Sequence, residues 1–137
     1  DKVVGARAES GLAIGAPEYL HALWRTRDLE KIAGQRMAGL DGWIMPTSPI
    51  LPAPVADLED PEVGGKYARL VTQNTQPGNL FRQSGTSTPI QHLGDGSLPI
   101  GLQLLCPGFA EERALSIALA MEALFGTPPA PNLKGFV

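Results

Sequence analysis

Residue types that bind metals are scarce in this chain of 137 residues. It has two histidines, His21 and His92, and a single cysteine, Cys106. No two of them have the spacing at which proteins bring metal ligands together. Cys106 follows two leucines, so we expect a small buried core residue rather than a nucleophile. The sequence therefore predicts neither a metal site nor a cofactor.

A serine nucleophile needs a base and an acid that converge on its hydroxyl. Ser84, Ser87, His92 and Asp95 are close in sequence, but closeness in sequence is a poor guide to that geometry. The chain also lacks the G-x-S-x-G turn that exposes such a serine in many hydrolases. We therefore expect structural roles for these four residues.

A glycine-rich segment and two pairs of acidic residues are the remaining candidates for a binding or catalytic site. Gly94-Asp95-Gly96 precedes an apolar run and lacks the lysine of a phosphate-binding loop, so it predicts a turn. Glu59-Asp60 and Glu111-Glu112 are adjacent pairs, whose side chains point apart on regular structure instead of flanking a scissile bond. The residues offer no self-contained catalytic group.

Composition narrows the class of protein. The net charge is −3 and the basic residues are scattered, which argues against a nucleic-acid partner. Apolar runs fall short of the roughly 20 residues of a membrane span, and no secretory leader opens the chain. A single cysteine fits a reducing compartment. We expect a cytoplasmic protein with no membrane association.

Helical spacing of apolar residues marks two long helices. The first extends from Pro17 to Leu40 and has two apolar faces, so it is either buried on both sides or bent near Arg27-Asp28. We favour one long helix packed between layers. The second, over residues 110–125, has acids in its first turn and Gly126 after its end.

Short apolar runs predict the strands. Trp43-Ile44-Met45 indicates a short buried strand, and the four prolines that follow predict a long ordered loop over residues 46–64. We expect a helix from Tyr67 to Asn74. Thr86–Gln91 and Ile100–Leu105 predict adjacent antiparallel strands, joined by a connection wider than a two-residue turn.

The order of these elements is an α/β layout with too few strands for a free-standing sheet. The chain is therefore expected to be part of a larger unit. Alone, it should unfold partly or associate with other copies through its exposed sheet edges.

Four segments, in order, resemble the amidase signature family. The similarity extends over nearly the whole chain and ends in a close match to the family's G-L-P-V-G-L-Q pattern, followed by an acid and a helix. The matching segments are Ala16–Leu20 with Arg25, Asp41–Pro49, Asn79 and Pro89, and Ser97–Leu105 with Glu111-Glu112 and the helix to Glu122.

The resemblance implies that residues 1–137 are the C-terminal portion of an amidase-signature α/β/α sandwich, with a mixed sheet between helices. Family members cleave the carbon–nitrogen bond of amides with a Ser–cis-Ser–Lys group, in which lysine and a bridging serine activate the nucleophile. Those residues belong to an upstream Gly/Ser-rich segment, so no catalytic residue is assigned here. The implied partners are a small amide substrate and the N-terminal part of the same enzyme.

Alignment with the family on Asn79 implies a wall of the acyl pocket at Thr72, Thr75 and Gln76. Members that use glutamine tend to carry an acid at the position of Thr72, so a neutral threonine argues against a glutamine-dependent amidotransferase. Arg82-Gln83-Ser84 replaces the family's G-x-P. Arg82 either forms a surface salt bridge, which we favour, or alters the pocket.

A second hypothesis is a non-catalytic interaction module. The proline-rich segment 46–64 contains P-x-x-P spacing, from Pro46 to Pro49 and from Pro49 to Pro52, which suits proline-recognising domains. That function would require the segment to be exposed and mobile.

Overall fold

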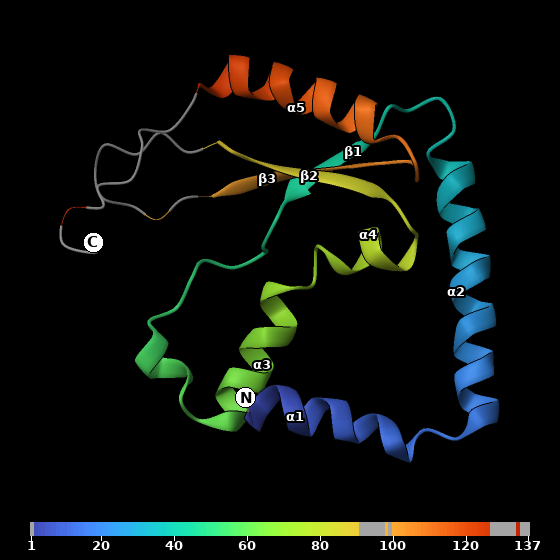
Figure 1. The fold of residues 1–137 in the computed structure, drawn as a ribbon, viewed down its shortest axis with the longest axis vertical. Helices are drawn as coiled ribbons and strands as arrows, with labels where there is room; N and C mark the ends of the chain where they lie inside the picture. Colours follow the sequence, from blue (N-terminus) through green and yellow to red (C-terminus); the bar gives the residue numbers. More distant parts are fainter. Residues whose placement is uncertain (1, 91–97, 99, 127–133, 135–137) are drawn as a thin grey trace.

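The computed structural model describes residues 2–90, 98, 100–126 and 134. A three-stranded antiparallel sheet in the order β1-β3-β2 has α5 on one face and α4, followed further out by α3, on the other (Figure 1). The remaining helices, α1 and α2, extend away from the sheet. The elements are α1 (Lys2–Glu9), η1 (Ser10–Ala13), α2 (Ala16–Arg36), β1 (Trp43–Pro46), η2 (Val55–Leu58), α3 (Pro61–Val71), α4 (Gln76–Leu80), β2 (Ser84–Pro89), β3 (Gly101–Cys106) and α5 (Glu111–Phe125).

β3 is the central strand because it is apolar enough to be covered on both faces. Residues 103–106 are all buried, and Cys106 is completely inaccessible. The strand pairs with β1 through Trp43↔Leu105 and with β2 through Ser84↔Cys106. Since side chains alternate between the faces of a strand, Leu104 and Cys106 lie on one face and Gln103 and Leu105 on the other.

α5 packs on the face of the sheet that carries Leu104 and Cys106. These side chains form the core with Ala114, and Ile117 and Met121 pack against it from the helix. The outer side of α5 remains exposed, where Leu115, Leu119 and Leu124 are 60–77% accessible. A helix with apolar residues on both sides normally has a partner on each.

The prediction of antiparallel strands is confirmed, with shifted bounds. β2 begins at Ser84, two residues earlier than expected, because Ser84 and Gly85 pair with Cys106 and Leu105 of β3. Pairing with a buried strand thus overrides the low strand propensity of serine and glycine. Residues 91–97 and 99, the predicted turn included, lie outside the described residues.

β1 forms where predicted, but it is not buried on both faces. Among the described strands it pairs only with β3, and Ile44 is 61% exposed because α5 lies over β2 and β3 instead. Pro46 ends β1 without disturbing the sheet, since an edge strand tolerates proline.

The first long helix is also confirmed as a single element, α2, although it ends at Arg36, before the predicted Leu40. Its predicted burial between layers is wrong for the described residues. None of its side chains is buried, and Leu20, Trp24 and Ile32 are each more than 40% exposed.

The predicted loop over 46–64 is wrong at its C-terminal end. η2 lies within it, and α3 begins at Pro61, so the helix expected from Tyr67 to Asn74 starts earlier and ends at Val71. The side chain of Asp60 accepts hydrogen bonds from the backbone N–H groups of Glu62 and Val63, which caps the helix. Gly64 and Gly65 are poor helix formers, so the sequence does not indicate that the helix begins before them.

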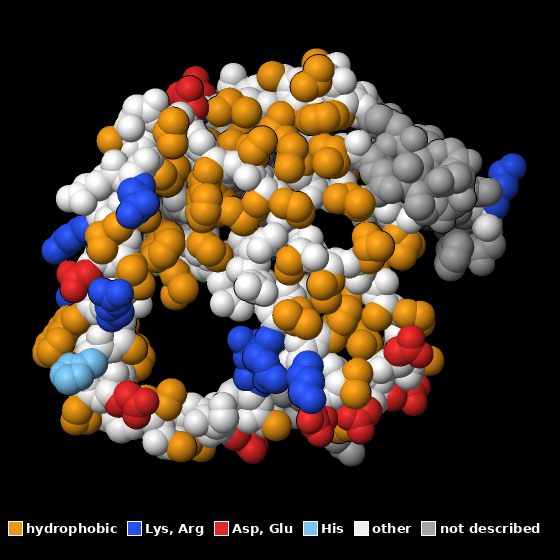
Figure 2. Space-filling view, turned by 180° about the vertical axis from the view of Figure 1, so that it is seen from behind, with side chains coloured by type: hydrophobic (Ala, Val, Ile, Leu, Met, Phe, Trp, Pro, Cys, Tyr) orange, Lys and Arg blue, Asp and Glu red, His pale blue; other side chains and the backbone are white. Residues whose placement is uncertain are grey.

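The described residues have the α/β architecture expected of part of an amidase-signature sandwich, with helices on both sides of a sheet. All strand pairs seen are antiparallel. Figure 2 shows hydrophobic side chains gathered over the sheet and α5, and an opening through the molecule below them. No helix within the described residues has the length and apolar character needed to cross a bilayer.

Candidate functional site

Thr72 and Thr75, two of the three residues predicted to form the substrate wall, lie in the turn between α3 and α4, and the third, Gln76, is the first residue of α4. Thr72 and Gln76 are exposed, and Thr75 is half-buried. Thr72 caps the C-terminus of α3, and its hydroxyl donates to the carbonyl of Ala68 at 2.9 Å. The hydroxyl of Thr75 donates to the carbonyl of Thr72, also at 2.9 Å. The turn is therefore compact and hydrogen-bonded internally.

Two side-chain amides tie this turn to the sheet. Gln103 of β3 is only 5% exposed, and its Nε2 donates to the backbone carbonyl of Asn74 at 2.9 Å. Asn74 in return donates from its Nδ2 to the carbonyl of Pro46, at the end of β1, at 2.7 Å. The turn is thus fixed to the central strand and to an edge strand.

A pair of hydroxyls lies on the same face of the sheet as Gln103. Thr47 Oγ1 and Ser87 Oγ are 2.5 Å apart, and the backbone N–H of Thr47 donates to the carbonyl of Gly101 at 2.8 Å. A Cβ at Gly101 would lie 2.6 Å from the Ser87 hydroxyl and 2.8 Å from that of Thr47, so only glycine leaves room for the pair.

A cavity of about 320 Å³ adjoins the Thr47 side of this cluster. Its walls come from the proline-rich segment, from α3 and from the start of β3. Thr72, Thr75 and Gln76 are not among the residues that line it. The main contributors are Thr47, Ile50, Tyr67, Val71, Ile100 and Gly101.

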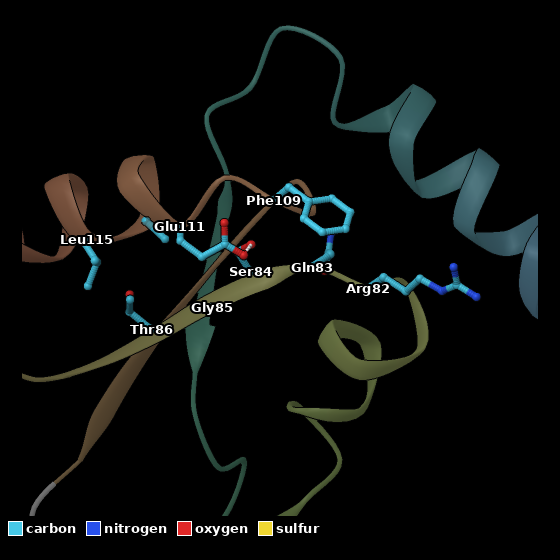
Figure 3. A pocket seen from close by; sticks show the side chains of 9 residues that line it. Arg82, Gln83, Ser84, Gly85, Thr86, Phe109, Glu111 and Leu115 are labelled. Carbon is cyan, nitrogen blue, oxygen red and sulfur yellow. Dashed lines mark hydrogen bonds between the residues drawn. The ribbon is translucent and has the colours of Figure 1, made fainter.

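A second cavity, of about 540 Å³, lies where β2 and α5 begin (Figure 3). Ser84 accepts a hydrogen bond from the backbone N–H of Ala110 at 3.2 Å and donates to the carboxylate of Glu111 at 3.0 Å. These bonds hold the N-terminus of α5 to the sheet, so Ser84 has a structural role. Thr86 Oγ1, also in this cavity, is buried without a hydrogen-bond partner.

Metal-binding chemistry finds no support within the described residues, where no group of three or more His, Cys, Asp or Glu could hold an ion. His21 is exposed on α2, beside the ring of Trp24. Burial raises the pKa of the Cys106 thiol; Arg113 opposes this effect and Asp41 adds to it. A thiol kept protonated in this way is a poor nucleophile or ligand. His92 and Asp95 lie outside the described residues.

Comparison with known proteins relates this fold to enzymes. No family model matches the chain. It is 31% identical, over 92% of its length, to 2-amino-5-chloromuconic acid deaminase of Comamonas testosteroni, and 39% identical over 66% to a glutamyl-tRNA(Gln) amidotransferase subunit of Salinispora tropica. The chain belongs to the amidase signature family.

Its fold is that of the amidase-signature enzymes. The corresponding glutamyl-tRNA(Gln) amidotransferase subunit of Thermotoga maritima superposes with a TM-score of 0.75 at 22% identity, over 98% of this chain and 29% of that protein. The chain spans only 27% of the deaminase and 18% of the Salinispora subunit. It therefore represents less than a third of the length of such enzymes.

One departure from the amidase-signature pattern has a visible consequence. Arg82, where the family has glycine, has a φ of 53°, in the left-handed region that favours glycine. Its side chain is exposed and points away from the Ser84–Glu111 pair (Figure 3). The salt bridge favoured from the sequence is not formed among the described residues.

The sequence analysis named Thr72, Thr75 and Gln76 but missed the residues that hold the turn around them. Asn74 and Gln103 were not proposed as site residues, nor were Thr47 and Ser87 as a pair. Gln103 ends the G-L-Q pattern and Thr47 lies in the P-T-x-P segment, so the motifs contained the signal. Strand register, which the motifs do not display, decides which of these side chains meet.

Proposed function

We propose that this chain forms one part of an amidase that cleaves the carbon–nitrogen bond of a small amide. The observation that carries the proposal is its 31% identity, over 92% of the chain, to a deaminase of the same family. Both the deaminase and the amidotransferase subunits are named for reactions at carbon–nitrogen bonds.

In this proposal, the Ser–cis-Ser–Lys group belongs to a segment of the enzyme outside residues 1–137. Its nucleophilic serine attacks the amide carbonyl while lysine, through the bridging serine, takes up the serine's proton. Residues 1–137 supply sheet strands, covering helices and one wall of the acyl pocket. In support, Ser84 and Ser87 both make hydrogen bonds that explain their presence without catalysis.

The proposed wall is the turn that contains Thr72 and Thr75, together with Gln76 at the start of α4. It presents hydroxyl and amide groups with no acidic side chain, which suits an uncharged acyl group better than one with an ammonium ion. We therefore favour a simple amide over glutamine.

The direct test compares this chain with the complete gene product on a panel of aliphatic and aromatic amides. We expect ammonia release from the complete enzyme and none from residues 1–137 alone. Amide hydrolysis by the chain alone, at a comparable rate, would contradict the assignment of the catalytic group. A complete enzyme inactive on every amide would contradict the proposed function.

Substrate preference is tested by Thr72→Asp in the complete enzyme. A carboxylate at this exposed position should attract a substrate ammonium, so kcat/KM for glutamine should rise relative to an uncharged amide by about tenfold. Thr72→Asn, of the same shape but neutral, is the matched control. If the preference is unchanged in both variants, Thr72 does not face the substrate.

The alternative of a docking module has less support. Tyr67 binds the backbone of the proline-rich segment, accepting from the N–H of Ala53 at 3.0 Å and donating to the carbonyl of Leu51 at 3.5 Å. A segment fixed to α3 in this way is exposed at its prolines but restrained in its backbone.

We also propose a cytoplasmic location, association between copies of the enzyme, and no cofactor.

A further inference from the structure

We propose that Gln103 is a positioning residue, which sets substrate affinity by fixing the turn that forms the acyl-pocket wall. The inference rests on the proposed function and extends it to a residue that does not contact the substrate. It gives a physical role to the last residue of the Gly101-Leu102-Gln103 pattern.

Burial of the Gln103 amide costs free energy unless hydrogen bonds offset the loss of water. Gln103 is 5% exposed in a strand whose buried neighbours are apolar. A buried amide is retained at such a position when its hydrogen bonds hold something in place. Its Nε2 donates to the Asn74 carbonyl at 2.9 Å, in the middle of the candidate wall.

Asn74 lies between the predicted wall residues in the chain. It lies two residues after Thr72 and one before Thr75, so its backbone cannot move without moving both. Its own side chain is bonded to Pro46 at 2.7 Å. Gln103 therefore holds the turn from the central strand, while Asn74 holds it from β1.

Strand register decides the face of the sheet on which the Gln103 side chain lies. Met45 and Ser87 are the partners of Gln103 on the two neighbouring strands, so all three lie on the face opposite α5. Gly101 shares that face and admits the Thr47–Ser87 hydroxyl pair. Gln103 and the hydroxyl pair therefore lie on the face of the sheet to which the turn is bonded.

The test uses Gln103→Met in the complete enzyme, which keeps the size of the side chain and removes the amide. We expect KM for amides to rise about tenfold with kcat within about threefold of wild type, because the wall is displaced while the catalytic group is untouched. Leu104→Val is the matched control: it loosens the neighbouring position on the α5 face and should leave KM unchanged.

Backbone amide exchange measured on the same proteins gives a readout that does not need activity. Exchange of residues 72–76 should accelerate in Gln103→Met and not in Leu104→Val. Gln103→Leu, a second apolar replacement that removes the same hydrogen bond, should show the same pattern and serves if Gln103→Met does not fold.

The outcomes separate the two proposals. An active enzyme whose KM and exchange at 72–76 are no more altered by Gln103→Met than by Leu104→Val overturns the positioning role. If exchange accelerates but KM is unchanged, the Gln103 hydrogen bond holds the turn without affecting substrate binding. That result overturns the positioning role as well. A wild-type enzyme inactive on all amides overturns the proposed function, and with it the effect on substrate affinity.

Discussion

Arg82 stands where the amidase-signature pattern has glycine, and its backbone adopts a conformation that favours glycine. Its φ of 53° is a conformation that costs an L-residue about 1–2 kcal/mol and glycine almost nothing. A Cβ at Gly108 would clash with the Arg82 carbonyl oxygen, so the backbone of Arg82 is also restricted by its close contact with Gly108. The left-handed turn is therefore imposed by packing, and arginine tolerates it.

This residue yields a stability prediction. Arg82→Gly in the complete enzyme should raise the free energy of unfolding by about 0.5–1 kcal/mol, since relief of strain exceeds the added chain entropy of glycine. Urea denaturation measures the change. Arg82→Ala removes the same charge and keeps the Cβ, so it should give no gain. Equal gains in both variants would attribute the effect to charge.

At the scale of the element, α3 depends on its N-terminal cap. The Asp60 carboxylate accepts from the N–H groups of Glu62 and Val63 at 2.9 and 3.0 Å, and Pro61 starts the helix with a fixed φ. The ion pair between Lys66 and Glu62 is exposed and contributes little. The cap is therefore the local interaction that decides where α3 begins.

We accordingly expect Asp60→Ala to lower the free energy of unfolding by about 1 kcal/mol and to speed amide exchange in the first turn of α3. Asp60→Asn retains an acceptor and should lose much less. The experiment combines urea denaturation with exchange mass spectrometry. Unchanged exchange in Asp60→Ala would mean that α3 is held by its contacts with neighbouring segments instead of by its cap.

At the scale of the whole molecule, the chain exposes more surface than a self-contained protein of its size. Its accessible area is 10352 Å² for 14.5 kDa, whereas a folded monomer of that mass exposes about 6,900 Å². Much of the excess is apolar and lies on α2 and on the outer side of α5. Surface of this kind is usually buried against other structure.

Residues 1–137 alone should therefore bind a hydrophobic dye and associate with rising concentration. Sedimentation velocity and dye fluorescence test this, and adding the N-terminal part of the enzyme in trans should suppress both signals. A chain that stays monomeric, binds no dye and unfolds in one cooperative transition would show that its exposed faces need no partner.

The sequence alone determined the elements whose signals are local. Helical spacing indicated α2 and α5, apolar runs indicated β1 and β3, and the order of the motifs indicated the family. It also placed Thr72, Thr75 and Gln76 together, because they lie within five consecutive positions. These features depend on near neighbours in the chain, which a sequence displays directly.

Tertiary structure alone decided what depends on residues far apart. β2 begins earlier than the sequence predicts because its first two residues pair with β3. The exposure of α2 depends on which elements pack beside it, and a sequence does not display that. The bond from Gln103 to Asn74 joins residues 29 positions apart, and strand register fixes which face each side chain takes. No periodicity records such a contact, so the means by which the candidate wall is held could be found only in three dimensions.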